Sequence, residues 1–190
     1  MTQRSVIVVV FDRWGAGQAS PLGATMLDMP FFNRLAASAL TANFCLADSP
    51  DLEQIYRSYW TGRHAADPRD GGELEHWLNG VDAHSLLVTD EPLVRDHPLA
   101  RHFEQKLILP PSTAQRTADE VAQTQLAKLL FAAGEAILNL DEPHVVWIHA
   151  QAMEAPWDAP LELRQSLRDE EDPEPPEWVF PPSRRIEGPK

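Results

Sequence analysis

An uninterrupted apolar run near the amino terminus, Val6 to Phe11, most constrains how this chain can fold. It is rich in β-branched side chains and is followed by one carboxylate, Asp12. A strand that is buried on both faces reads as a continuous apolar run, whereas a half-exposed strand alternates apolar and polar residues. The run therefore predicts a central strand of a parallel sheet covered by helices. Asp12 then lies at the carboxyl end of that strand, where ligands bind in open α/β sheets; the alternative is a turn aspartate exposed to solvent.

Two later segments have the same character and also end in a polar side chain. Residues 84–89 precede Asp90, and residues 144–148 precede His149. Segments with helical periodicity separate them, and the longest is predicted to begin behind a capping box at residues 117–120. This alternation predicts an α/β fold with a mainly parallel sheet. The remaining expected elements are helices at 31–40, 49–61, 73–79 and 93–103, a half-buried strand at 41–47 and a short edge strand at 106–109.

Composition excludes several classes of partner. The 29 acidic and 16 basic residues give a formal charge of −13, which argues against binding to nucleic acid or to an anionic membrane. The single cysteine, Cys45, permits no internal disulfide, and we expect it to be a small core residue. The sequence has no signal-peptide pattern and no apolar run of about 18 residues. We therefore expect a soluble, cytoplasmic protein.

The carboxyl-terminal part differs in composition from the rest of the chain. Residues 162–177 contain seven acidic residues, two arginines and three prolines, a composition that does not cover a core. We expect residues 1–160 to form the α/β domain and residues 161–190 to form an irregular, acidic, proline-rich tail.

Four segments carry motifs whose order and spacing resemble those of one known family. The strand that ends at Asp12 opens the series. Residues 29–40 resemble the helix motif T-P-N-L-D-R-L-A-A-E-G-V, and residues 49–63 resemble a segment that ends in L-L-T-G-R. Residues 145–149, with the turn at 155–160, resemble a strand followed by P-H-x-P-Y-x-x-P. Together these motifs resemble the sulfatase branch of the alkaline-phosphatase superfamily.

The resemblance implies a three-layer α/β/α fold and hydrolysis of sulfuric esters. In that family an oxidised Cys or Ser attacks the sulfate, while a divalent cation, calcium, and basic residues hold the anionic oxygens. Asp12 matches the first metal-ligating aspartate. The family's later metal ligands would lie beyond Lys190, so the resemblance implies that residues 1–160 are only the amino-terminal part of the catalytic domain.

Several positions depart from the family pattern, and each departure removes a group that catalysis in the family needs. The nucleophile position is Leu52, which cannot attack sulfur, and the second aspartate of the opening pair is Arg13. The family's anion-binding Lys and His are absent around residues 88–92. We therefore expect a sulfatase-like protein without catalytic residues and without a bound cofactor, in which Asp12 is a remnant of a metal site.

Two other functions remain open from the sequence. Asp12, Asp90 and His149 lie at predicted strand ends, and two carboxylates with an imidazole could hold zinc or manganese in a metal-dependent hydrolase. Alternatively, the six tryptophans suggest a binding or scaffold module that uses Trp147, Trp157 and Trp178. The simpler explanation is that Trp147 is a core residue and the others cover the sheet edge. A sheet edge left uncovered by an incomplete domain would also favour self-association.

Overall fold

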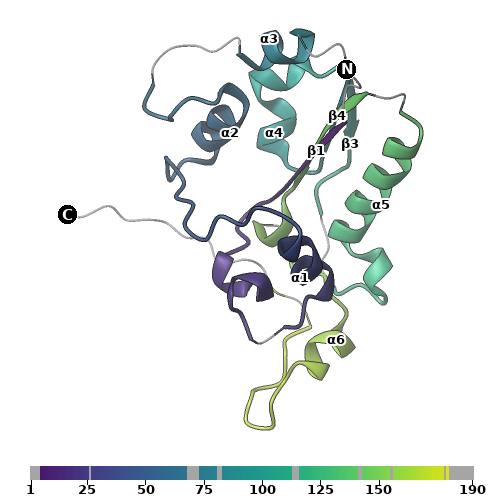
Figure 1. Cartoon of the computed structure of the whole chain (residues 1–190). Helices are drawn as coiled ribbons and strands as arrows, with labels where there is room; N and C mark the ends of the chain where they lie inside the picture. Colours follow the sequence, from purple (N-terminus) through teal and green to yellow (C-terminus); the bar gives the residue numbers. More distant parts are fainter. Residues whose placement is uncertain are drawn as a thin grey trace, which may run out of the picture. The chain divides into compact units, whose positions relative to one another are not determined.

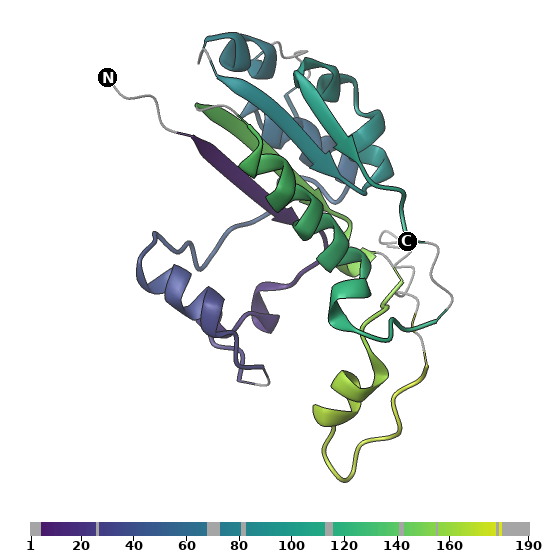
Figure 2. The same ribbon diagram turned by 90° about the vertical axis from the view of Figure 1, so that its right-hand side faces the viewer.

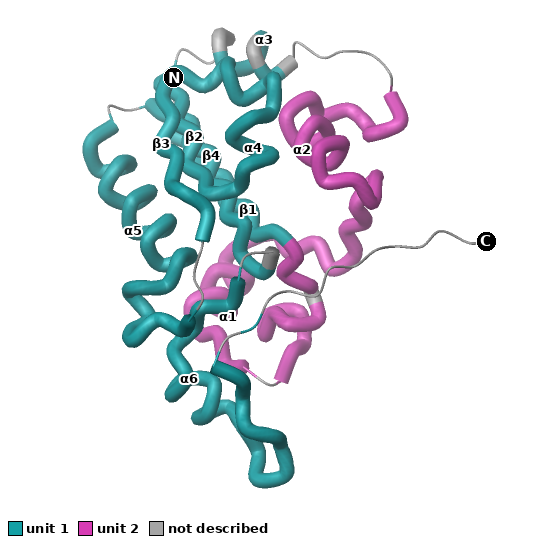
Figure 3. Tube along the Cα trace, turned by 180° about the vertical axis from the view of Figure 1, so that it is seen from behind, with its two compact units in different colours: residues 1–12, 74–190 teal, residues 13–73 magenta. Residues whose placement is uncertain are grey.

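The computed structural model describes residues 5–25, 27–67, 73–80, 83–112, 116–140, 143–154, 156–177 and 179. The chain forms two compact units, one of residues 1–12 with 74–190 and one of residues 13–73 (Figure 3). The first unit contains the whole sheet.

The first unit is built on a four-stranded parallel sheet. The strand order is β1-β4-β2-β3, and every neighbouring pair is parallel. Figure 2 shows the four strands side by side. The predicted α/β fold with a parallel sheet is therefore confirmed. The strands are β1 (Val6–Phe11), β2 (His84–Thr89), β3 (Gln105–Ile108) and β4 (His144–Ala150).

Helices cover both faces of this sheet, as a three-layer fold requires. The longest helix, α5 (Gln125–Leu138), packs on one face through Leu129 and Ala133, which meet alternate residues of the two central strands. Helices α3 (Glu73–Gly80) and α4 (Pro92–Asp96) lie on the other side of the sheet (Figures 1 and 3). Five of the six residues of β2 are buried, because the strand has helices on both faces.

β1 does not have the central place that its apolar sequence predicts. Among the described strands it is an edge strand that pairs with β4 alone. Val6, Ile7 and Val9 are 42–51% exposed. The prediction of a buried central strand is therefore wrong for β1, and the central positions belong to β4 and β2. A continuous apolar run indicates a strand, but it does not tell how many neighbours that strand has.

The start of α5 also differs from the sequence prediction. Thr124 is the capping residue, and its hydroxyl accepts from the N–H of Ala127 at 3.3 Å. The segment at 117–120 does not form the predicted capping box, because the helix begins only at Gln125. In this segment Ala118 donates its N–H to the carbonyl of Asp158 at 2.7 Å. The short 3-10 helix η4 (Val121–Gln123) lies between this segment and α5.

The second unit contains α1 (Pro30–Ala37) and α2 (Leu52–Thr61). Gly62 ends α2 in the left-handed conformation, with φ of 65°, which glycine adopts without strain. Asp48 precedes α2 and accepts hydrogen bonds from the hydroxyl of Ser58 and the N–H of Ala65. These hydrogen bonds hold the pKa of Asp48 below its ordinary value.

Residues 41–47 form no strand, and Cys45 is exposed. The predictions of a strand there and of a core cysteine are therefore wrong. Alternation alone does not make a strand, because these residues have no strand beside them to accept their backbone hydrogen bonds.

The remaining helices are short. The helix predicted at 93–103 is split before Pro98 into α4 and the 3-10 helix η3 (Pro98–His102), because proline has no N–H to donate inside a helix. The predicted irregular tail begins with α6 (Leu161–Ser166).

No described helix combines the length and the apolarity needed to cross a membrane. The other 3-10 helices are η1 (Ala16–Gln18), η2 (Ser20–Leu22) and η5 (Ala152–Glu154).

Candidate functional site

The carboxyl ends of β1, β4 and β2 carry the polar side chains that the sequence singled out. His149 lies in β4, in register with Val10 of β1 and with Thr89 of β2. Asp12 follows β1 and Asp90 follows β2. All three side chains are buried. Parallel pairing therefore brings these strand ends to one edge of the sheet.

Asp12 and His149 form a buried pair at this edge. Asp12 Oδ2 lies 3.0 Å from His149 Nε2, and the two side chains are 7% and 1% exposed. The indole N–H of Trp147 donates to His149 Nδ1 at 3.5 Å. Because an indole N–H can only donate, this contact assigns the accepting role to Nδ1 and the proton to Nε2. The imidazole thus donates its Nε2–H to the Asp12 carboxylate.

The backbone around this pair is fixed on both sides. The N–H of Asp12 donates to the carbonyl of Ala150 at 3.1 Å, and the carbonyl of Asp12 accepts from the N–H of Met153 at 3.2 Å. Ala152 has a positive φ of 46°, which is unfavourable for a residue with a Cβ. The chain after β4 therefore turns back over the end of β1 and holds Asp12 in place.

Asp90 is held separately, by two amide groups. Its Oδ1 accepts from the backbone N–H of Gln151 at 2.8 Å, and its Oδ2 accepts from the side-chain amide of Gln125 at 3.1 Å. The same amide nitrogen donates to the carbonyl of Pro110 at 2.9 Å. Asp90 therefore links the end of β2 to the chain after β4 and to the first residue of α5.

Thr89 adds a further link between the central strands. Its hydroxyl donates to the carbonyl of His149 at 2.7 Å and accepts from the N–H of Glu91 at 3.0 Å. Sequence reasoning did not identify Thr89, Gln125 or Gln151. Each acts through a tertiary contact, and no local spacing in the sequence signals such a contact.

The divalent cation that the resemblance implies does not fit the described residues. A histidine nitrogen that binds a metal must be unprotonated, but Nε2 of His149 donates to Asp12 and Nδ1 accepts from Trp147. Calcium requires six to eight oxygen ligands, and the two carboxylates at these strand ends, Asp12 and Asp90, supply four at most. Within the described ranges, no three His, Cys, Asp or Glu side chains are grouped closely enough to hold a metal.

The other predicted site residues lie elsewhere. Leu52 is the first residue of α2 in the second unit, where Asp51 caps the helix by accepting from the N–H of Gln54 at 3.3 Å. Its side chain is aliphatic and offers no nucleophile. Trp157 is 37% exposed and joins Val179 in a backbone bridge. Trp178 lies outside the described residues.

An apolar cavity of about 240 Å³ lies beside Asp90, on the side of the sheet that faces the start of α5. Leu126, Met153, Trp157 and Leu163 line it together with Asp90. The carboxylate of Asp90 is engaged by Gln125 and Gln151, so this cavity offers mainly apolar contacts.

No protein-family model matches the sequence, and no curated protein matches it. Two solved structures share its fold. One is the phosphonate monoester hydrolase of Agrobacterium radiobacter, with a TM-score of 0.65 and 15% identity over 89% of this chain. The other is the C-terminal periplasmic domain of EcEptC from Escherichia coli in complex with Zn, with a TM-score of 0.58 and 14% identity over 79% of this chain.

Both structures are members of the alkaline-phosphatase superfamily, so the likeness shows a fold of that type. At 14–15% identity the likeness extends to the fold alone. The chain spans 44% of the length of each of these structures.

Proposed function

We propose that this chain is a sulfatase-like protein that does not hydrolyse esters. The fold is that of the alkaline-phosphatase superfamily, and the sequence motifs resemble its sulfatase branch. The shared fold carries no activity by itself, because chemistry depends on the residues at the site. The proposal therefore depends on what stands at each position where the resemblance requires a reactive group.

The observation that carries the proposal is the buried Asp12–His149 pair. Asp12 matches the first metal-ligating aspartate of the family, and here its Oδ2 accepts the proton of His149 Nε2 at 3.0 Å. A cation bound to Oδ2 of Asp12 would lie close to the Nε2–H group of His149, which already donates to that oxygen. To admit a metal, the imidazole would have to lose a proton or turn away, although Trp147 holds its other nitrogen.

The nucleophile position supports the same proposal independently. Leu52 occupies it, and a hydrocarbon side chain cannot form a covalent intermediate. Arg13 replaces the second aspartate of the opening pair, and a positive charge there opposes the binding of a divalent cation. These changes remove the attacking group and the metal together.

The test is an ester hydrolysis assay on the purified chain. Aryl sulfate, aryl phosphate and aryl phosphonate monoesters are incubated with calcium, zinc and manganese in turn, and with a chelator. We expect no release of the aryl alcohol above the protein-free rate. Asp12→Ala is the matched control, because turnover by a contaminating enzyme would be the same in that variant. Turnover that the chelator and Asp12→Ala both abolish contradicts the proposal.

The competing candidate is a metal-dependent hydrolase that uses Asp12, Asp90 and His149, although in the described residues these three side chains are not grouped closely enough to hold a metal. Two of these three side chains lie within 3.0 Å of each other, and an imidazole with a carboxylate suits zinc or manganese. The test is elemental analysis of the purified protein and of the variants Asp12→Ala, Asp90→Ala and His149→Ala. Equal metal content in all four proteins eliminates this candidate.

In a non-enzymatic role the chain would act through a surface that binds another molecule and not through a catalytic site. β1 is the structural basis for one such role, because it presents exposed Val6, Ile7 and Val9 and has β4 as its only partner among the described strands. An apolar edge strand is a template for pairing with another chain. We therefore propose that a second copy of the chain pairs through β1.

A further inference from the structure

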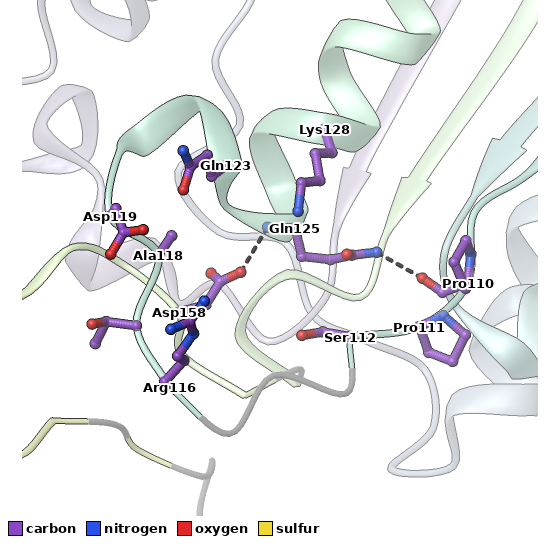
Figure 4. A pocket seen from close by; sticks show the side chains of 11 residues that line it. Pro110, Pro111, Ser112, Arg116, Ala118, Asp119, Gln123, Gln125, Lys128 and Asp158 are labelled. Atoms are coloured by element: carbon purple, nitrogen blue, oxygen red, sulfur yellow. Dashed lines mark hydrogen bonds between the residues drawn. The ribbon is translucent and has the colours of Figure 1, made fainter.

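A second and larger cavity lies in the first unit, at the start of α5 and away from the Asp12–His149 pair. Its volume is about 630 Å³, within the range of 300–1,000 Å³ that small-molecule sites commonly have. Figure 4 shows the side chains that surround it. Unlike the apolar cavity beside Asp90, it is lined mainly by charged and other polar side chains. They include Ser112, Arg116, Thr117, Asp119, Gln123 and Lys128.

Two cations face this cavity without an acidic partner. Lys128 comes from the first turn of α5, and Arg116 comes from the segment before η4. Within the described ranges neither forms an ion pair. In a chain with 29 acidic and 16 basic residues, acidic partners are plentiful. The two cations are thus available to a ligand.

One carboxylate of the lining, Asp158, already accepts a hydrogen bond. Asp158 Oδ2 accepts from the backbone N–H of Gln125 at 2.7 Å, as the dashed line in Figure 4 shows. This N–H belongs to the first residue of α5, where the positive end of the helix dipole offsets a negative charge. Asp158 therefore caps the start of α5, and within the described residues it forms no ion pair with Arg116 or Lys128.

The other lining groups suit hydroxyls. Asp119 is exposed and offers carboxylate oxygens, which only accept hydrogen bonds. Gln123 and Thr117 can both donate and accept. A guanidinium binds phosphate or carboxylate through two parallel N–H groups, and an ammonium adds a point charge. The cavity thus combines a cationic part with a part that binds hydroxyl groups.

We propose that this cavity binds a small polyhydroxylated anion of the sugar phosphate class. Arg116 and Lys128 bind the anionic group, and Asp119 and Gln123 bind the hydroxyls. This site is separate from the strand ends and does not depend on the proposed absence of hydrolysis. It needs no metal and involves no bond cleavage.

The test is isothermal titration calorimetry at low ionic strength with glucose 6-phosphate, inorganic phosphate and glucose. We expect glucose 6-phosphate to bind about tenfold more tightly than phosphate, because both parts of the cavity are engaged, and glucose alone to bind too weakly to measure. Binding of glucose 6-phosphate should weaken as salt is added. Equal affinity for glucose 6-phosphate and phosphate, or no binding of either, overturns the proposal.

Variants then assign the two parts of the cavity. The double variant Arg116→Gln, Lys128→Gln should weaken glucose 6-phosphate binding by about tenfold or more. The control is Lys106→Gln, which removes an exposed cation of β3 outside the cavity and should change the affinity less than about twofold. All variants lie at exposed positions, and thermal unfolding confirms that they fold. A control that loses as much affinity as the double variant contradicts the assignment.

Substitution of Asp119 should strengthen the binding of inorganic phosphate, whereas substitution of Arg116 and Lys128 should weaken the binding of glucose 6-phosphate. Asp119→Asn removes a negative charge that repels an anion, so inorganic phosphate should bind about two- to threefold more tightly. The same change weakens the contact with sugar hydroxyls, so the preference for glucose 6-phosphate over phosphate should narrow. An unchanged preference means that Asp119 does not contact the ligand, and this contradicts the proposed hydroxyl-binding part.

Discussion

β1 and β4 have similar apolar sequences but different environments. Both read as strands that should be buried on both faces. β4 pairs on both sides, with β1 and β2, and all but one of its residues are buried. β1 pairs with β4 alone, and Ile7 is 51% exposed.

The difference shows what an apolar run does and does not encode. It specifies an extended, β-branched segment, and that prediction is confirmed for both strands. It does not specify the number of neighbours, because that depends on which other strands are available to pair. β4 is central because β1 pairs with it on one side and β2 pairs with it on the other. The difference in burial between β4 and β1 should be measurable as a difference in the free energy of unfolding lost when each strand is substituted.

The largest expected effect separates the two strands by a matched substitution. Ile148→Ala in β4 should reduce the free energy of unfolding by about 3 kcal/mol, because it leaves a cavity in the buried core. Ile7→Ala in β1 should reduce it by about 1 kcal/mol or less, because half of that side chain is already in water. Urea unfolding measures both values. Equal losses would mean that β1 is as buried as β4.

The second effect tests the link between the ends of these strands. Asp12→Ala should cost about 2 kcal/mol, since it leaves the buried N–H of His149 without this acceptor. Asp12→Asn keeps an oxygen at the same place and should cost less than half as much. Chemical denaturation of the two variants provides the comparison. If the two losses are alike, the hydrogen bond to His149 contributes nothing to stability.

The third prediction compares the two edges of the sheet. If the chain self-associates through β1, Ile7→Lys should weaken that association by about tenfold, because a charge on an edge strand opposes pairing. Ile108→Lys on β3 is the control and should have no effect, although β3 is also an edge strand. Sedimentation equilibrium measures the association. Association that Ile7→Lys leaves intact does not pass through β1.

The smallest effect concerns the contact that holds α5 to the strand ends. Gln125→Ala removes the amide that donates to Asp90 and to the carbonyl of Pro110. The loss should be about 1 kcal/mol of unfolding free energy. Gln123→Ala, two residues earlier and exposed, should change stability by less than about 0.5 kcal/mol. Thermal unfolding of both variants tests this, and a loss as large for Gln123→Ala would contradict the role of Gln125.

Local patterns predicted most of the fold. β2 and β4 follow from continuous apolar runs, and α2 and α5 follow from helical periodicity. Gly62 marks the end of α2, as its position after the last periodic residue indicates. The strand at residues 41–47 was wrong because alternation is a weak signal when no partner strand is present. The capping box at 117–120 was wrong because the helix begins only at Gln125, where Thr124 is the capping residue.

The site was predicted only where strand ends specify it. Asp12 and His149 lie at the ends of strands, and parallel pairing brings them together. Their hydrogen bond, its direction and the role of Trp147 depend on side-chain positions that no spacing encodes. The same holds for Gln125 and Gln151, which reach Asp90 from elements distant in sequence.

The most direct test of the central claim is a calorimetric titration of the purified chain with zinc, manganese and calcium. Because the Asp12 carboxylate accepts the proton of His149, we expect no saturable binding of any of the three ions at this site. Binding of one ion per chain that disappears in both Asp12→Ala and His149→Ala would contradict the claim, and would show that the pair opens to hold a metal.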